Sequence, residues 1–401
     1  MFTCWHRPVH KDLILPGLSQ SGYNRPVSAP VIEHFSDHLY EGKVNLKDLL
    51  PEEIEQFFAL LGEPAYRARQ VIRWLYVRGE SEFENMTDLS KDLRARLAEV
   101  AVIPRLSTRR FQSSKNQDTT KYLFELPAGG EVESVRMRYL ENLGPGRVAV
   151  CISSQVGCAM ACDFCASGLL GLKRHLKTWE IVDQVMQIQL DVREQDERVS
   201  NVVFMGLGEP LHNYDNVLRA IRLLNLAEGM GIGMRHLTVS TSGLVPKIRK
   251  LAEEKLSIRL AISFHATDDE LRSKMMPVNR RWPIAELLQA CREYQAVTER
   301  RITFEYILLD GVNDSVAEAQ RLGELLEGIH ALVNLIPWNP VEGIPYQRSR
   351  PAAVRAFQDK IEEFGIKCTV RQEKGSDIDA ACGQLRLRDL GETRPRRART
   401  A

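Results

Sequence analysis

The chain has 401 residues, of which 44% are hydrophobic, and a formal net charge of +1. This length favours two domains or one large domain, and the charge excludes a globally basic nucleic-acid-binding protein. No apolar run reaches the roughly 18 residues that a membrane span needs, and no signal-peptide core is present near the start. The eight cysteines therefore indicate a reducing cytoplasm with metal-binding or catalytic thiols rather than a disulfide scaffold.

The first part of the chain divides into an extension and a helical region. Residues 1–43 contain repeated prolines and are predicted to form a poorly ordered extension. Over residues 44–104 apolar residues recur at helical spacing, which predicts three helices around Ile54, Ala68 and Leu93. Residues 61–110, which overlap this small helical accessory domain, carry ten Lys and Arg against seven Asp and Glu, although a charge run on a helix is often only a solvated face.

Residues 105–146 are predicted to form a β-hairpin linker. Segments 121–126 and 132–137 alternate polar and apolar residues on either side of Gly129 and Gly130. A short glycine-containing turn between two such segments is typical of antiparallel pairing.

Residues 147–385 alternate strand-like and helical segments six times. Strands are predicted over 148–153, 200–205, 236–241, 257–263, 302–309 and 331–336. Helices are predicted over 178–193, 213–228, 243–254, 283–297, 316–327 and 351–364. This alternation is typical of an α/β fold whose parallel sheet closes wholly or partly into a (β/α)6 barrel, with its chemistry on the loops after the strands. Residues 386–401 follow as a basic tail.

The most informative motif is CAMACDFC at residues 158–165, in which Cys158, Cys162 and Cys165 are spaced Cys-x3-Cys-x2-Cys. An iron–sulfur cubane has four irons, each usually bound by one thiolate, so three local cysteines leave one iron open. The alternative is a zinc site completed from elsewhere, although zinc motifs more often pair two cysteines with a distant second pair. The spacing resembles that of radical S-adenosylmethionine (SAM) enzymes, in which SAM chelates the open iron of a 4Fe-4S cluster.

Polar loops follow several of the predicted strands. Gly208 lies in a glycine-rich turn that allows close backbone approach to a ligand, and Glu209 offers a carboxylate for an ammonium group. Each such loop could be an ordinary turn. Because they follow successive strand ends of one barrel, they are predicted to line one ligand pocket. The corresponding residues of the later loops are Ser240, Ser263, Phe264, His265 and Asn339.

Two further cysteines are candidates for chemistry. Cys382 lies in a segment of small and acidic residues that is unlike a core segment, and Cys151 lies near the end of the first barrel strand. A buried inert thiol is the usual interpretation of an isolated cysteine, and it is kept here for Cys4, Cys291 and Cys368.

Taken together, seven motifs resemble the RlmN-type methyltransferases, which methylate adenine C2 in 23S ribosomal RNA and in certain transfer RNAs. The resemblance runs from about Val44 to Leu385. The motifs are VCISSQVGC (150–158), CAMACDFC (158–165), FMGLGEPL (204–211), VSTSGLVP (239–246), LAISFHATDD (260–269), LIPWNP (335–340) and DIDAACGQL (377–385). The chain departs from the family pattern in its first 40 residues, in a longer loop after Tyr139, at Lys374, where arginine is common, and at Phe264, where leucine is common.

The resemblance implies a role for each candidate. Cys158, Cys162 and Cys165 would hold the cluster, and the polar loop residues named above would bind SAM, of which two molecules are used per turnover. Cys382 would become S-methylcysteine and then form a covalent adduct with the RNA. Cys151 would release the product by forming a disulfide with Cys382. Glu133 would accept the C2 proton, for which the Cys151 thiolate is the alternative.

The resemblance also implies the partners. These are 23S ribosomal RNA, transfer RNA and an external one-electron reductant such as a flavodoxin, with a monomeric protein and no membrane. Residues 44–104 are expected to hold the RNA that flanks the target base, by phosphate contacts. Three alternatives are open: a Cfr-type enzyme that methylates adenine C8, a different radical SAM activity in which Cys151 and Cys382 have no role, and a zinc-bearing RNA-binding protein.

Overall fold

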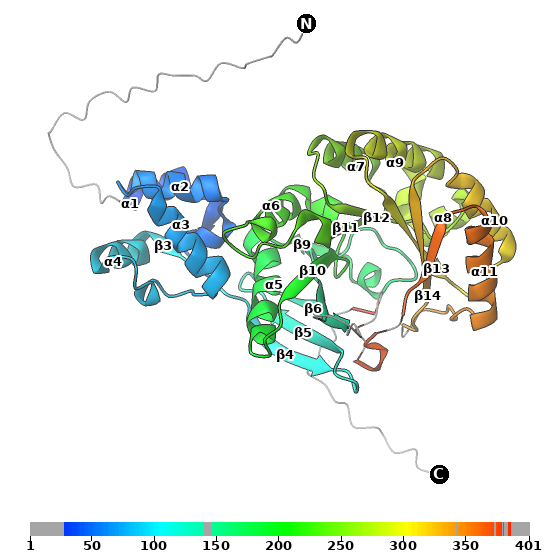
Figure 1. Cartoon of the computed structure of the whole chain (residues 1–401), viewed down its shortest axis with the longest axis horizontal. Coiled ribbons are helices and arrows are strands. Elements are labelled where there is room, and N and C mark those ends of the chain that lie inside the picture. The colour runs from blue at the N-terminus through cyan, green and yellow to red at the C-terminus, as the bar shows by residue number, and fades with distance from the viewer. Residues whose placement is uncertain are drawn as a thin grey trace, which may run out of the picture.

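The computed structural model describes residues 28–139, 146–341, 343–372, 374–378, 380, 384 and 385. Most of residues 1–43, the tail 386–401 and Cys382 lie outside the described residues, so the predictions made for them stay predictions. The largest element is a ten-stranded sheet in the order β15-β14-β13-β12-β11-β10-β7-β6-β5-β4 (Figure 1).

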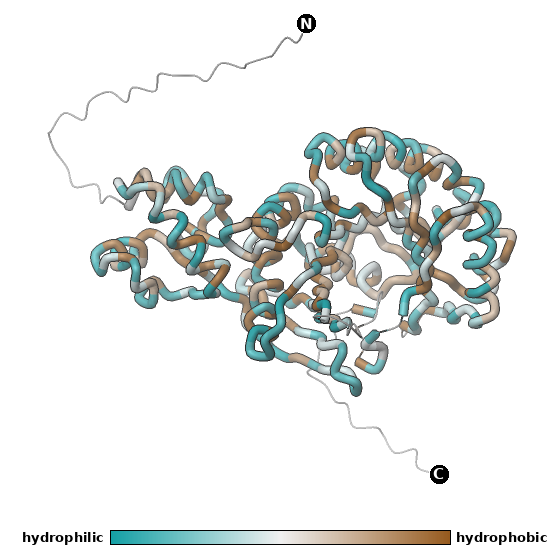
Figure 2. Tube along the Cα trace, in the orientation of Figure 1, coloured by the Kyte–Doolittle hydropathy of each residue, from teal (hydrophilic) through white to brown (hydrophobic). Residues whose placement is uncertain are grey.

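The parallel part of this sheet confirms the predicted alternation. Its strands are β7 (Arg147–Cys151), β10 (Val199–Phe204), β11 (Leu237–Thr241), β12 (Arg259–Ser263), β13 (Ile302–Leu308), β14 (Ala331–Pro337) and β15 (Lys367–Val370). Its main helices are α5 (Thr178–Arg193), α6 (Tyr214–Asn225), α7 (Val245–Glu253), α9 (Ile284–Thr298), α10 (Val316–Leu325) and α11 (Pro351–Glu363). Figure 1 shows the helices on the outer side of the curved sheet, and Figure 2 shows hydrophilic and hydrophobic residues alternating along them. The fold is therefore a partial barrel of parallel strands covered on the outside by amphipathic helices.

The predicted hairpin is part of an antiparallel meander on the same sheet. It consists of β4 (Ser107–Ser113), β5 (Thr119–Glu125) and β6 (Glu131–Tyr139). β6 pairs antiparallel with β7, with Val135 opposite Cys151, so the meander continues the barrel sheet. Two strands of this ten-stranded sheet were not predicted. β4 is almost entirely exposed and shows no apolar alternation, and β15 is a short edge strand with few apolar residues.

Strand register determines which residues share the concave face of the sheet. Cys151 is in register with Val203 of β10, and Val203 is in register with Thr238 of β11. Residues directly opposite each other on neighbouring strands project to the same face, and so do residues two positions apart on one strand. Ser240 and Glu133 therefore share the concave face with Cys151.

The N-terminal region is helical, as predicted. It contains the three predicted helices α2 (Pro51–Leu60), α3 (Tyr66–Arg73) and α4 (Lys91–Val100), with one π-helical turn at Trp74–Arg78. The helix α1 (Ser28–His34) was not predicted: it lies in the stretch expected to be a poorly ordered extension, and it is ordered because Val31 and Phe35 are buried in the core. Pro51 occupies the first turn of α2, where its missing N–H costs no hydrogen bond, and the Glu53 carboxylate accepts a hydrogen bond from the N–H of Leu50 at 2.7 Å.

Buried polar contacts fix the helical region to the barrel helix α5. The Lys47 ammonium lies 2.6 Å from Asp183 of α5, and both side chains are almost fully buried. The second oxygen of Asp183 accepts a hydrogen bond from the N–H of Leu106 at 2.7 Å. Arg219 of α6 adds an ion pair with Glu53 at 2.5 Å. In Figure 1 the helical region lies beside α5 and α6, on the side of the barrel away from α10 and α11.

Candidate active site

The cysteine triplet lies on a loop that a small separate hairpin holds in place. β8 (Gln155–Gly157) pairs with β9 (Leu172–His175), and the Cys158 N–H donates to the carbonyl of Gly171 at 3.1 Å. Gly157 has φ +76°, and a Cβ there would lie 1.8 Å from the Gly171 carbonyl oxygen. Only glycine fits at this close approach of the two chains, so Gly157 determines where the thiol of Cys158 lies.

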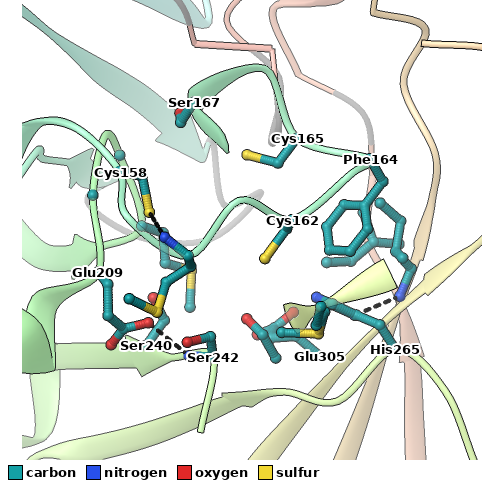
Figure 3. A pocket seen from close by; sticks show the side chains of 18 of the residues that line it. Cys158, Cys162, Phe164, Cys165, Ser167, Glu209, Ser240, Ser242, His265 and Glu305 are labelled. Atoms are coloured by element: carbon teal, nitrogen blue, oxygen red, sulfur yellow. Dashed lines mark hydrogen bonds between the residues drawn. The ribbon is translucent and has the colours of Figure 1, made fainter. Parts of the chain in front are cut away.

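The three thiols open into one cavity, which we call the cysteine cavity. It encloses about 920 Å³, part of which is open to solvent. Figure 3 shows Cys158, Cys162 and Cys165 around this space, facing Glu209, Ser240, Ser242, Glu305 and His265. Its lining also includes Gly208, Ser263, Phe164, Met205 and Arg371. Gly208, Glu209, Ser240, Ser263 and His265 thus lie together with the cysteines.

The chemistry of these thiols fits a cluster. Cys158, Cys162 and Cys165 line one cavity, and in a cubane each thiolate binds a different iron. Burial raises the pKa of the Cys158 thiol to about 12 and raises the pKa of Cys162 well above its usual range. Without a bound cation these thiols stay protonated, because a metal is what stabilises a buried thiolate.

Glu209 is a buried carboxylate that points toward the cavity. One oxygen accepts from the N–H of Ser242 at 2.7 Å and the other accepts from the N–H of Leu211 at 3.1 Å. Burial raises its pKa, and these hydrogen bonds oppose the rise. A carboxylate held in this way can take a positively charged group such as an ammonium as its third partner.

His265 is fixed as a neutral hydrogen-bond donor. Its Nδ1 accepts a hydrogen bond from the N–H of Ile307 at 3.1 Å, which leaves the proton on Nε2. Burial, reinforced by the nearby Arg272, lowers its pKa to about 3. The ring also contacts Phe164 edge to face at 4.9 Å, so its orientation is set on two sides.

Two predicted pocket residues lie outside the cysteine cavity. Phe264 is fully buried on the opposite side of its strand, where its ring meets Phe304 edge to face at 5.7 Å. Strand alternation explains this position, because Ser263 already points to the cavity and the next side chain must point away. Asn339 lines an adjoining side cavity, which we define by Tyr139, Asn339, Arg371, Lys374 and Ala380. Arg371 borders both cavities.

Cys151 and Glu133 lie on the concave face, next to the cysteine cavity rather than in its lining. Cys151 is buried at the end of β7. Glu133 lies on the neighbouring strand β6, where its carboxylate is 3.3 Å from the ammonium of Lys121. Its carbonyl accepts a hydrogen bond from the Ser153 hydroxyl at 2.6 Å, two residues beyond Cys151. The two predicted catalytic residues therefore come from adjacent strands of the meander and the barrel.

The sequence neighbours of Cys382 lie at the barrel mouth, although Cys382 itself is outside the described residues. Ala380 lines the side cavity. Gln384 donates to the carbonyl of Pro340 at 3.0 Å, and the Leu385 carbonyl accepts from Ser167, a residue of the cysteine cavity, at 3.1 Å.

Several cavity residues were not predicted from the sequence. Glu305 of β13 is buried and points into the cysteine cavity, and its carboxylate accepts a hydrogen bond from Asn334 at 2.7 Å. Burial raises its pKa. A lone glutamate inside the apolar run ITFEYILL was the available signal, since such a residue is rarely buried without a role. Lys121, the partner of Glu133, carried no comparable signal.

Comparison with known proteins identifies both parts of the chain. Residues 44–103 match the family described as the ribosomal RNA large subunit methyltransferase N-terminal domain, and residues 152–322 match the radical SAM superfamily. A probable dual-specificity RNA methyltransferase RlmN from Thermoanaerobacter sp. (strain X514) is 48% identical over 87% of this chain and 99% of its own length. Its counterpart from Symbiobacterium thermophilum is 50% identical over 86% of this chain and 92% of its own length.

A solved structure supports the same conclusion. A radical SAM methyltransferase from Sphaerobacter thermophilus is 45% identical, covers 85% of this chain and 99% of its own, and superposes with a TM-score of 0.81. This agreement extends from the helical region through the cysteine motif to the last barrel strands, so the chain belongs to the RlmN family of dual-specificity RNA methyltransferases within the radical SAM superfamily.

Proposed function

We propose that the enzyme methylates C2 of an adenosine in 23S ribosomal RNA, at the peptidyl transferase centre, and C2 of the adenosine 3′ to the anticodon in some transfer RNAs. The observation that carries the proposal is the gathering of Cys158, Cys162 and Cys165 with Glu209 in one cavity, in a chain that belongs to this family. Cys151 and Glu133 face the same side of the sheet.

The cofactors follow from the cavity. Cys158, Cys162 and Cys165 would hold a 4Fe-4S cluster, and Gly208, Glu209, Ser240, Ser263 and His265 would hold SAM beside it. The other two members of the expected set lie outside this cavity: Asn339 lines the adjoining side cavity, and the side chain of Phe264 is in the core. When bound, these groups supply a methyl cation equivalent from one SAM and a hydrogen-abstracting radical from a second. Glu209 would bind the SAM ammonium, and His265 would donate to a ring acceptor of its adenine.

A radical route suits the substrate atom. Adenine C2 lies between two ring nitrogens and is not nucleophilic, so it cannot displace the methyl of SAM directly. Cys382 would first take the methyl as a thiolate and become S-methylcysteine. That methyl would give a hydrogen atom to the SAM-derived radical and join C2 through its carbon, and the adduct would give its unpaired electron to the cluster as the C2 proton leaves to Glu133. The Cys151 thiolate would then attack the Cys382 sulfur and break the S–C bond. The released carbon takes a proton to become the methyl of the RNA, and a disulfide is left.

The RNA must present an unstacked base. Flipping a base costs a few kcal/mol and is cheapest in a loop or bulge, which is where single adenosines are accessible. The helical region offers cationic groups and one exposed aromatic ring for the flanking strand. Arg67 stacks on the exposed ring of Tyr66 at 4.8 Å, and the exposed Arg78 covers the buried ring of Trp74 at 3.8 Å. The arginines can meet phosphates, and Tyr66 can meet a base.

The remaining expectations concern partners and location. We propose a monomer that receives single electrons from a flavodoxin-like reductant and acts in the cytoplasm. The described part of the chain contains no helix long and apolar enough to cross a bilayer.

The test is an anaerobic assay of the iron-reconstituted protein with SAM, a reductant and unmodified 23S ribosomal RNA. Digested RNA is analysed by mass spectrometry against 2-methyladenosine and 8-methyladenosine standards. We expect a 2-methyladenosine peak that disappears in Cys382→Ala. An 8-methyladenosine peak would replace the C2 assignment with a Cfr-type activity, and SAM cleavage without RNA methylation would refute the substrate.

A further inference from the structure

Gln155 connects the glycine-rich turn of the cysteine cavity to the protein surface. It is fully buried in β8. Its side-chain oxygen accepts a hydrogen bond from the backbone N–H of Glu209 at 2.8 Å. Its side chain also packs directly on Gly208, where an added Cβ would lie 2.6 Å from the Gln155 Cβ. The side chain of Gln155 therefore fixes the conformation of the turn that carries Glu209.

The amide nitrogen of Gln155 faces two exposed histidines. It lies 2.9 Å from Nδ1 of His175 and 3.2 Å from Nδ1 of His212. The two imidazoles meet edge to face with their centroids 4.9 Å apart. Because a primary amide nitrogen only donates, both Nδ1 atoms must be unprotonated for these bonds to form.

We propose that Gln155 is a positioning residue that holds the backbone of Glu209 for SAM, and that protonation of the His175–His212 pair releases it. This rests on the proposed function, in which Glu209 binds the SAM ammonium. Protonation places an N–H on Nδ1 opposite the amide NH2. The amide can satisfy that N–H only by rotating, which turns its NH2 toward the N–H of Glu209. Protonation of the histidine pair at the surface therefore breaks the hydrogen bond from the Glu209 N–H to Gln155.

The surroundings favour the neutral pair at ordinary pH. Burial and the neighbouring His212 lower the pKa of His175. Arg174, the sequence neighbour of His175, is paired with Glu180 at 2.7 Å, and Glu209 lies on the other side of the Gln155 amide. The hydrogen bond to Glu209 is thus made at neutral pH and is lost as the pH falls and the histidines take up a proton.

The experiment measures SAM binding to the reconstituted holoenzyme by anaerobic calorimetry, from about pH 8 down to about pH 5.5, a range that spans the usual histidine pKa. We expect affinity to weaken toward low pH in the wild type. His175→Gln combined with His212→Gln should remove that dependence. His236→Gln is the matched control, because His236 is also exposed and also faces a side-chain amide, that of Asn201 at 3.2 Å, and it should keep the dependence. An unchanged slope in the double variant would overturn the switch.

Gln155→Leu tests the positioning role. Loss of one neutral hydrogen bond should weaken SAM about three- to tenfold at pH 8 and flatten the pH dependence. Gln155→Glu still accepts from Glu209 and prefers protonated histidines, so it should retain affinity at low pH. Wild-type affinity in Gln155→Leu, at full iron content and unchanged unfolding temperature, would overturn the proposal. A wild-type holoenzyme that does not bind SAM at any pH would instead refute the proposed function.

Linkage provides a second measurement that does not depend on activity. If protonation of the pair weakens SAM, SAM must lower the pKa of the pair by the same factor. Histidine titration by NMR with 13C-labelled histidine should show this shift for His175 or His212 and none for His236. Equal pKa values with and without SAM would contradict the coupling.

Discussion

At the scale of single residues, Glu305 shows that the cysteine cavity is maintained at a cost in stability. Its carboxylate is buried, and burial raises its pKa, while Arg371 and the bond from Asn334 oppose the rise. A carboxyl whose pKa is higher in the folded state than in the unfolded state is best tolerated when protonated. The stability that such a carboxyl contributes is therefore fully present below the pKa that it has in the unfolded chain. It is lost as the pH rises through the pKa that the carboxyl has in the folded protein.

We predict that Glu305→Gln raises the unfolding temperature of the SAM-free protein at neutral pH. The free energy of unfolding should also fall less steeply with rising pH in this variant. A single titrating group changes that free energy by at most about 1.4 kcal/mol per pH unit. Thermal unfolding followed across pH measures both effects. The control Glu270→Gln, at an exposed position in α8 (Asp269–Met275), should change neither. A lower unfolding temperature in Glu305→Gln would show that the charged carboxylate is structurally required.

The residue scale also marks the limit of motif matching. Gly208, Glu209, Ser240, Ser263 and His265 were predicted from their loops and lie together in the cavity. Phe264 was predicted with the same motif, and its side chain lies in the core. A motif identifies a segment, whereas strand alternation decides which of its side chains reach the ligand. Glu305 and Gln155 were missed because their roles depend on contacts between strands far apart in sequence.

At the scale of elements, the contact between the helical region and α5 depends on a buried ion pair. Lys47 is almost fully buried; burial lowers its pKa, and the charge of Asp183 opposes this. We predict that Lys47→Met destabilises the protein by about 3–5 kcal/mol, since it leaves Asp183 buried without its cation. Urea unfolding measures the loss. Arg249→Met, which breaks an exposed 2.6 Å pair with Glu293, should cost less than about 1 kcal/mol.

A companion variant separates charge from packing at this contact. Combining Lys47→Met with Asp183→Leu removes both charges and should recover part of the lost stability. No recovery would mean that Asp183 is needed chiefly for its hydrogen bond from Leu106.

Elements were predictable to the extent that burial left a pattern in the sequence. The six barrel strands and their helices have apolar faces and were predicted close to their observed bounds. β4 is solvated along its length and β15 is an edge strand, so neither has such a face. That the meander pairs with β7 could not be predicted, because pairing between β6 and β7 is specified by contacts across the sheet rather than by local periodicity.

At the scale of the whole molecule, the barrel and the helical region act as one body, which determines how RNA binding should be tested. Deleting residues 44–104 would expose the buried Asp183 and the apolar face that packs against it, and so would confound folding with binding. Point changes on the exposed side of α3 avoid this. Arg69 and Arg73 lie one turn apart, are exposed, and form no ion pair with any described carboxylate.

We predict that Arg69→Gln combined with Arg73→Gln weakens RNA binding and leaves methylation of Cys382 unchanged. Each lost phosphate contact should reduce the slope of log affinity against log salt by about 0.7–0.9. Filter binding over a salt series measures the slope, and peptide mass spectrometry measures S-methylcysteine. The matched control is Arg292→Gln combined with Arg355→Gln, two exposed arginines on α9 and α11, on the side of the barrel away from the helical region. Equal slopes in the two double variants would place the RNA elsewhere on the barrel. A smaller slope and weaker binding confined to the α3 variant would mean that the helical region holds the RNA strand while the cysteine cavity modifies the base.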